Sequence, residues 1–171
     1  MKKLLVFLFV MAGLNVFAQE KIETTDQFTI EGAVKHPLTV TLQTLGTDNK
    51  VTVFDSVVIK NHLLQPRYTM KKLKGVLLKD LIDKAEVDAS SPKVLSEYYV
   101  VCIASDNYKV VFSWNELYNT DIGNHVMVIT ESDGKPAKAG EDRIAVLSAS
   151  DQATGRRFLK SLAKIIVERV K

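Results

Sequence analysis

The chain has 171 residues, and 46% of them are hydrophobic, which is enough for one domain with a buried core. Its 23 basic and 20 acidic residues give a formal net charge of +3. This near balance argues against a nucleic-acid-binding protein, because such proteins draw much of their affinity from a large excess of positive charge.

The first 18 residues have the features of a cleaved secretory signal peptide. Lys2 and Lys3 form a positive start, and an apolar run follows from Leu4 to Ala12. A membrane anchor is the alternative, but the run is short for a membrane span and Asn15 interrupts the segment. We expect cleavage after Ala18 and a periplasmic or secreted mature chain of about 153 residues, with 21 basic residues against 20 acidic ones once Lys2 and Lys3 are removed.

The residue types that bind metals or form disulfides are few and scattered. Cys102 is the single cysteine, so no intramolecular disulfide can form. It stands in the apolar run YYVVCIA, and we interpret it as a small buried hydrophobic residue. His36, His62 and His125 do not pair with one another, with a cysteine or with a carboxylate at the spacing of metal ligands, so no metal site is expected.

The first half of the mature chain is typical of β structure. Three segments have the alternation or the β-branched content of strands, namely residues 28–34, 38–45 and 50–59. The second of these is either a strand throughout or a strand that runs into a turn, and the third has a kink at Asp55-Ser56. The segment from residue 61 to 75 is polar, weakly patterned and broken by Pro66, so we expect it to be irregular.

The second half begins with the clearest helix, Val76–Val87, whose apolar residues recur with helical spacing. Glu97–Trp114 reads as two strands joined by a turn at residues 105–107, and Asn115–Asn119 as a short helix. The remaining strands are expected at residues 125–137, which end in a turn, at 142–150, and from Phe158 onward, where a short helix is the alternative. The predicted class is α+β, mostly β, with a mixed, barrel-like sheet, one clear helix and short extra helices.

Four motifs in a fixed order carry a resemblance to a known family. In chain order they are Gly75–Leu81, Ser105–Tyr108, Asp133–Pro136 and a final series of Gly155, Arg157, Leu159, Lys160, Leu162 and Ile165. Together they resemble the sulfite-oxidase-type molybdopterin-binding domain over about residues 28–167. The resemblance implies that fold for a single domain from residue 19 to 171, and it implies a pterin or molybdopterin-like ligand.

One departure from the family decides which branch the chain is closer to. The catalytic members hold their metal through a cysteine ahead of the helix, whereas this chain has no cysteine between Phe28 and Gly75. No other side chain replaces a soft thiolate. The chain therefore resembles the short secreted branch that keeps the pterin end of the site and lacks the metal-ligand cysteine.

Resemblance to that branch implies a non-catalytic periplasmic protein that binds a small heteroaromatic ligand without a metal, and in some members a membrane signalling partner protein. Two alternatives remain open. The first is a molybdopterin-dependent oxidoreductase with an atypical metal site, and the second is a scaffold that docks to a protein partner.

Binding a pterin ring requires an aromatic face for stacking and polar groups along the ring edge. Trp114 and Tyr68 are the candidates for the aromatic face. Asp106, Asn107 and Tyr108 lie on the turn that the family places near its cofactor. The alternative for Asp106 and Asn107 is ordinary turn chemistry, because both residue types favour tight turns.

An anionic tail on the ligand calls for arginine side chains or backbone N–H groups. Arg156 and Arg157 follow Gly155, and Lys160 matches the lysine of the family motif. The alternative is that the two arginines only keep a surface turn hydrated. Ser150 and Asp151 complete the predicted ligand-binding set, with Ser148 and Thr154 as further polar groups nearby. No catalytic residue is predicted.

Overall fold

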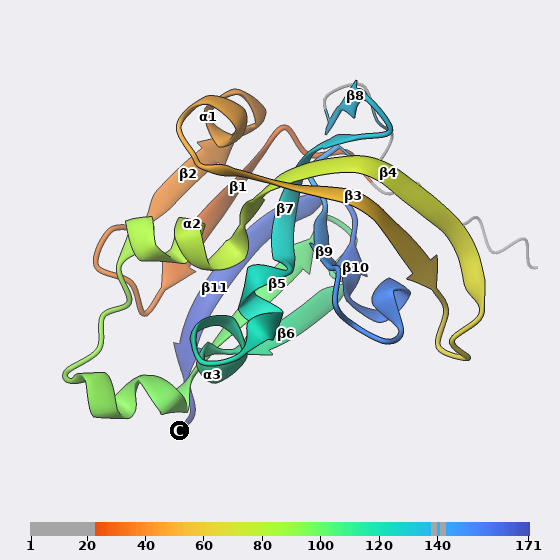
Figure 1. Cartoon of the computed structure of the whole chain (residues 1–171). Coiled ribbons are helices and arrows are strands. Elements are labelled where there is room, and N and C mark those ends of the chain that lie inside the picture. The colour runs from red at the N-terminus through yellow and green to blue at the C-terminus, as the bar shows by residue number, and fades with distance from the viewer. Residues whose placement is uncertain (1–22, 138–139, 141–142) are drawn as a thin grey trace, which may run out of the picture.

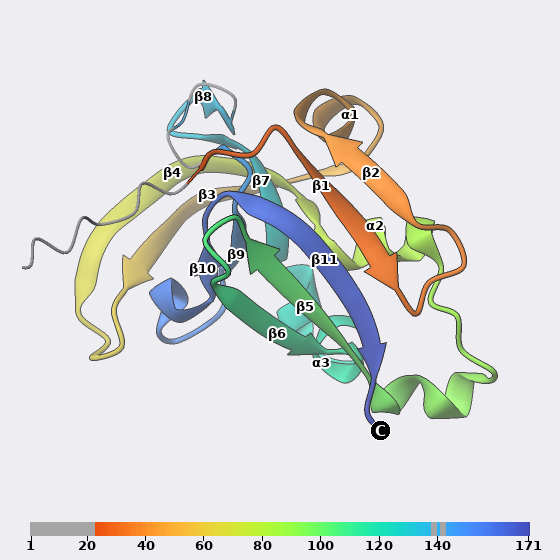
Figure 2. The ribbon, with the colours of Figure 1, turned by 180° about the vertical axis from the view of Figure 1, so that it is seen from behind.

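The computed structural model describes residues 23–137, 140 and 143–171, so the predicted signal peptide lies outside the described residues. One sheet contains five strands in the order β2 (Leu38–Thr41), β1 (Gln27–Gly32), β11 (Leu162–Arg169), β5 (Tyr98–Ala104) and β6 (Lys109–Ser113), as Figure 2 shows. β1 and β11 are parallel, and the other neighbours in this sheet are antiparallel. The last strand therefore lies between the first strand and the β5–β6 hairpin, which joins the two ends of the chain.

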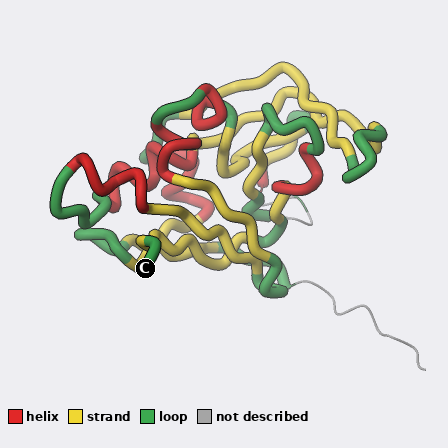
Figure 3. The backbone as a smooth tube through the Cα atoms, turned by 90° about the horizontal axis from the view of Figure 1, so that it is seen from below, coloured by secondary structure: helices red, strands yellow, loops and turns green. Residues whose placement is uncertain are grey.

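The second sheet is antiparallel throughout. Its order is β10 (Phe158–Leu159), β9 (Val146–Ser148), β7 (Val126–Ser132), β4 (Pro66–Leu77) and β3 (Val51–Lys60), and β8 (Lys135–Pro136) pairs with β7. Figure 3 shows the strands of the two sheets as separate bands. The prediction of an α+β, mostly β fold is confirmed, although the described strands form two sheets and no single closed barrel.

The helices are short and lie mainly to one side of the sheets (Figure 1). They are α1 (Leu42–Thr47), α2 (Leu78–Ala85) and α3 (Trp114–Tyr118), with the 3₁₀ segments η1 (Pro92–Glu97), η2 (Asp121–Asn124) and η4 (Thr154–Arg157). α2 packs Leu81 and Ile82 into the core beside Phe28 and Phe112 of the five-stranded sheet. Within the described part of the chain, none of the helices has both the length and the hydropathy that crossing a membrane requires.

The clearest sequence helix is shorter than predicted. Helix α2 begins at Leu78, because Val76 and Leu77 are still paired with Val128 and Met127 of β7. Near the amino terminus, the segment from residue 38 to 45, predicted as a strand or as a strand that runs into a turn, leaves the sheet after Thr41. The side chain of Thr41 caps the next residues as α1, since its Oγ1 accepts a hydrogen bond from the Thr44 backbone N–H at 3.2 Å.

The prediction that residues 61–75 are irregular is wrong. Twelve residues from Pro66 onward form β4, which pairs with β3 along its length. Pro66 is tolerated because it occupies the first position of the strand, and a proline there costs little pairing. The two strands make a long ribbon that extends beyond the sheet (Figure 1), so most of the side chains near its tip are exposed and the segment has no clean hydrophobic pattern.

The predicted kink at Asp55-Ser56 is visible in the burial of β3. Phe54 packs toward the interior, and the next inward side chain is Val57, three residues later and not two. Opposite the kink, Lys72 of β4 adopts a φ of 48°. The alternation of inward and outward side chains along β3 therefore shifts by one residue at the kink.

Gly75 supplies a close approach between β4 and β7 and gives the first prediction. A Cβ at Gly75 would lie 2.6 Å from the Val128 carbonyl oxygen and 2.8 Å from the Met127 sulfur, whereas a Cβ at Gly46 in α1 would meet nothing within 4 Å. Gly75→Ala should lower the free energy of unfolding by about 1–3 kcal/mol, and Gly46→Ala should leave it unchanged or raise it by up to about 1 kcal/mol. Urea denaturation of both variants checks this, and equal stabilities would contradict the packing described here.

Candidate functional site

The site is built around the contact between η4 and the end of β3. Thr154 is buried, and its Oγ1 accepts a hydrogen bond from the Lys60 N–H at 2.8 Å and donates one to the Val58 carbonyl oxygen at 2.8 Å. Gly155 follows directly, and a Cβ there would lie 2.8 Å from the Lys60 carbonyl oxygen. Thr154 and Gly155 thus bring η4 against the edge of β3, with the Gly required by the close approach.

A second contact ties η4 to the β5–β6 turn. The hydroxyl of Tyr108 donates a hydrogen bond to the carbonyl oxygen of Arg156 at 2.7 Å. In the same turn, Asn107 has a φ of 66°, and the Tyr108 N–H donates to Asp106 Oδ1 at 2.9 Å. The turn chemistry of Asp106 and Asn107 is therefore present, and it orients Tyr108 toward η4.

The two adjacent arginines serve different purposes. Arg157 forms a bidentate pair with Asp151, with Nε–Oδ2 at 2.7 Å and Nη2–Oδ1 at 2.6 Å. Its Nη1 donates to Glu116 Oε1 at 3.0 Å, and its guanidinium carbon lies 4.4 Å from the centre of the Phe112 ring. Arg157 thus connects η4 to α3 and β6, while Arg156 is exposed.

The charges of this network are reflected in the pKa of each partner. Burial alone would raise the pKa of Asp151, but hydrogen bonds from Arg157 and Ser148 outweigh it and lower that pKa. Burial likewise acts against hydrogen bonds from Ser113 and Arg157 on Glu116, and the net effect lowers its pKa as well. The hydrogen bond to Asp151 raises the pKa of Arg157. All three groups are therefore held in their charged forms.

A groove opens where η4, the tip of the β3–β4 ribbon and the β5–β6 turn meet. It has a volume of about 620 Å³, and we call it the cationic groove. Its lining consists of Ile59, Lys60, Asn61, His62, Arg67, Tyr108, Gly155, Arg156, Phe158 and Lys160. The lining contains four lysine or arginine residues, a histidine and two aromatic rings, but no carboxylate.

Most of the positive charge in the groove is not neutralised within the protein. Among the residues that the structure describes, none forms an ion pair with Lys60, Arg67 or Arg156. Lys160 holds its Nζ 5.5 Å from the centre of the Phe158 ring. A smaller hollow of about 150 Å³ adjoins the groove, and there Asp106 joins Tyr108, Phe158 and Lys160.

The predicted site residues separate into three groups. The cationic groove and its hollow bring together Asp106, Tyr108, Gly155, Arg156 and Lys160. Ser150 and Asp151 line a second groove on the other side of the η4–β3 contact. Arg157, Asn107, Tyr68 and Trp114 line neither of these two grooves.

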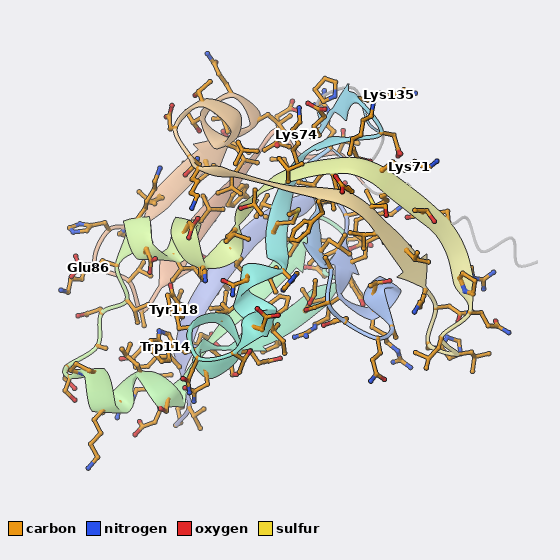
Figure 4. The ribbon with its side chains drawn as sticks, in the orientation of Figure 1. Lys71, Lys74, Glu86, Trp114, Tyr118 and Lys135 are labelled. Atoms are coloured by element: carbon orange, nitrogen blue, oxygen red, sulfur yellow. The ribbon has the colours of Figure 1, made fainter. Side chains whose placement is uncertain are left out.

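Trp114 lies away from the groove, at the start of α3. Its ring stacks on Tyr118, with the ring centres 4.8 Å apart, and both side chains lie below α2 (Figure 4). The hydroxyl of Tyr118 donates to Asp83 Oδ1 at 2.8 Å, so the pair joins α3 to α2. The aromatic faces that line the groove belong instead to Tyr108 and Phe158.

The sequence reasoning missed the contribution of the β3–β4 ribbon and of Phe158. Asn61, His62 and Arg67 lie at the ribbon tip in the segment that the sequence predicts to be irregular, and Lys60 directly precedes that segment. A signal existed, because three of these four side chains are basic and Phe158 directly follows the two arginines. Without β4 in place, however, nothing in the sequence brings residues 60–67 to residues 155–160.

Among the residues that the structure describes, no thiolate lies near the cationic groove. Cys102 is fully buried in β5, as predicted, and burial raises the pKa of its thiol to about 12. Within the described ranges, no group of three or more His, Cys, Asp or Glu side chains is arranged to hold a metal ion. The donor set around the groove, cations beside aromatic faces, suits an anionic planar ligand.

Comparisons with known proteins give information on the fold of the chain. No family model and no curated protein matches the chain. Among solved structures, it is similar to the sulfane dehydrogenase SoxCD from Paracoccus pantotrophus, with a TM-score of 0.65 and 15% identity over 88% of this chain. The chain spans 41% of that protein's length. The likeness shows the fold, so the predicted sulfite-oxidase-type arrangement is confirmed.

Removing the Arg157 guanidinium, which pairs with Asp151 and Glu116, should destabilise the fold in a pH-dependent way. Asp151 and Glu116 have pKa values below their ordinary 3.8 and 4.5, so the stability they contribute is present above about pH 5 and is lost as the pH falls through the lowered values. Arg157→Met should lower the free energy of unfolding by about 2 kcal/mol at pH 7. The deficit should begin to shrink below about pH 5, where the carboxylates start to become protonated in the unfolded chain, and should shrink further as the pH falls through the lowered pKa values of the folded parent.

Urea denaturation at pH 7 and at pH 3.5 measures both deficits. Arg156→Met is the matched control, and its stability should stay within about 0.5 kcal/mol of the parent at both pH values. A deficit for Arg157→Met that is the same at both pH values would contradict the ion-pair network.

Proposed function

We propose that the protein is a non-catalytic binding protein for an anionic pterin-type ligand, which the cationic groove holds. The observation that carries the proposal is the lining of this groove, where Lys60, Arg67, Arg156 and Lys160 surround two aromatic rings without a carboxylate among them. Such a lining favours a flat ring with a phosphate or another anionic tail.

The two parts of the ligand would meet different residues. The anionic tail would lie between Arg156 of η4 and Lys60 of β3, and Thr154 and Gly155 hold these two elements together. The ring would lie against Phe158 and Tyr108, and its amino-bearing edge would face Asp106 in the adjoining hollow. A carboxylate is the natural acceptor for an amino-pyrimidine edge, because a buried donor without an acceptor costs free energy.

Recognition without redox chemistry fits the position of the only cysteine. Cys102 lies in the core of the five-stranded sheet and is not among the residues that line the cationic groove, so it could not supply a metal-binding thiolate there. The proposal therefore assigns the chain to the branch of the fold that lacks the metal-ligand cysteine. The signal peptide expected from the sequence adds a periplasmic or secreted location to the proposal, with a membrane signalling protein as the expected partner.

The proposal is tested with a matched pair of ligands, a pterin that carries a phosphate monoester and the same pterin without phosphate. The phosphorylated form should bind at least tenfold more tightly, because one charge-assisted hydrogen bond contributes about 1.4 kcal/mol or more. Isothermal titration calorimetry measures both affinities. Equal affinities, or no binding of either pterin, would contradict the proposal, as would stoichiometric molybdenum in protein purified from a host that makes the cofactor.

Two variants locate the binding site. Arg156→Gln should weaken binding of the phosphorylated pterin about tenfold, since it removes one charged donor from the groove. Lys135→Gln is the control, because Lys135 is also exposed but lies in β8, away from the groove (Figure 4). The same loss in both variants would show that only overall charge matters.

A further inference from the structure

We propose that the open edge of β3 is a docking site at which an extended peptide of a partner protein pairs its main chain with Ser56. The site is the second groove, which we call the β3-edge groove. It has a volume of about 460 Å³, and its lining includes Phe54, Ser56, Val58, Asp121, His125 and Ser150. It is separated from the cationic groove by the contact between Thr154 and Lys60, and it does not depend on the proposed ligand.

The direction of the Ser56 main chain follows from the hydrogen bonds of its partner. Ser56 is the antiparallel partner of Lys71 in β4. The Lys71 N–H donates to Asp133 Oδ1 at 2.9 Å, and the Lys71 carbonyl oxygen accepts from the Asp133 N–H at 2.7 Å. Because Lys71 directs both groups away from β3, the pair is of the non-hydrogen-bonded type, and the N–H and C=O of Ser56 point out of the sheet.

The next outward positions show that this edge accepts hydrogen-bonding partners. Main-chain direction alternates along a strand, so Val58 and Lys60 point the same way as Ser56. There the Thr154 side chain bonds to the Val58 carbonyl oxygen and to the Lys60 N–H. At the end of β3, Thr154 thus makes the hydrogen bonds that a neighbouring strand would otherwise make. At Ser56 the edge is open, because β3 is the terminal strand of its sheet among the described residues.

The side chains that line the β3-edge groove would contact the side chains of a bound peptide and would favour certain residue types. Beside the edge, the ring of Phe54 from β3 stacks on the ring of His125 with their centres 5.5 Å apart, and both rings line the groove. Along β3, Val53 is 57% exposed and Val58 is 38% exposed. The one lysine of the strand, Lys60, lies at its end, where Thr154 already covers the edge, so it does not protect the edge at Ser56. Asp121 lines the groove with a side chain that is 81% exposed, which favours a basic residue in the peptide.

A peptide strand fits this edge better than a second copy of the chain does. Antiparallel pairing of two copies about Ser56 would place Val58 of each copy opposite Phe54 of the other. The edge at Val58 is already covered by Thr154 and η4, so that symmetric arrangement would collide with η4 in both copies. A single extended peptide that ends before Val58 avoids this collision. Main-chain pairing of this kind is a common mode of peptide recognition.

The experiment begins with a displayed library of random peptides selected on the purified protein. Synthetic versions of the selected peptides are then titrated calorimetrically against Ser56→Ala and Ser56→Pro. Ser56→Ala keeps the main-chain N–H, so its affinity should stay within about twofold of the parent. Ser56→Pro removes that N–H and should weaken binding at least tenfold. Asp121→Asn should weaken only those peptides that carry a lysine or an arginine.

A second measurement tests main-chain pairing without changing the protein. Methylation of single backbone nitrogens along the peptide should abolish binding at alternate positions only, because alternate N–H groups of a strand face the edge. Folding of Ser56→Pro is a further check, since its melting temperature should match that of Ser56→Ala if the Ser56 N–H points outward. Val57→Pro, which removes an inward N–H, should melt at a clearly lower temperature.

Each of several outcomes would overturn the proposal. These are the absence of any selected peptide, equal binding to Ser56→Ala and Ser56→Pro, and loss of binding that does not alternate with the methylated position. A dimer that dissociates on the Ser56→Pro change would identify a second copy as the occupant. Failure of the phosphorylated pterin to bind would leave the peptide result unaffected, because the two ligands use different grooves.

Discussion

The contact between η4 and the end of β3 is the constraint on which the rest of the site depends. Thr154 satisfies two main-chain groups of an open strand edge, and the absence of a side chain at Gly155 lets the two segments approach. Arg157 then fixes the same turn from the opposite side through Asp151 and Glu116. Because the contact separates two grooves, the same residues determine where the cationic groove ends and where the open edge of β3 begins.

The charge distribution around η4 follows from the different surroundings of Arg156 and Arg157. Arg157 is enclosed by two carboxylates whose pKa values it lowers, so its charge is balanced within the fold. Arg156 projects from the same short segment without an ion-pair partner among the described residues, and it adds to the charge of Lys60 and Arg67. One dipeptide thereby contributes both to the stability of the turn and to a positive surface for a ligand. This division explains how a chain of modest net charge presents a groove of a single sign.

Local sequence patterns predict much of the fold, and the main wrong prediction concerns the segment from residue 61 to 75. The β5–β6 hairpin, the kink at Asp55-Ser56 and the closing strand β11 were predictable because alternation and turn residues act over a few positions. The strand β4 was not, since its tip is solvated and carries little hydrophobic alternation. Without β4, the sequence could not place Lys60 and Arg67 beside Arg156. Trp114 is the single tryptophan of the sequence and a candidate for ligand stacking, yet it stacks on Tyr118 in a packing role that only the three-dimensional arrangement of α2 and α3 reveals.

The most direct test of the account is a crystal structure of the protein with a phosphorylated pterin. The account predicts a phosphate within hydrogen-bonding distance of the Arg156 guanidinium and the Lys60 ammonium group, with the ring against Phe158 or Tyr108 and η4 unmoved on β3. A ligand bound beside Trp114, or a ligand that enters only after η4 has separated from β3, would contradict it.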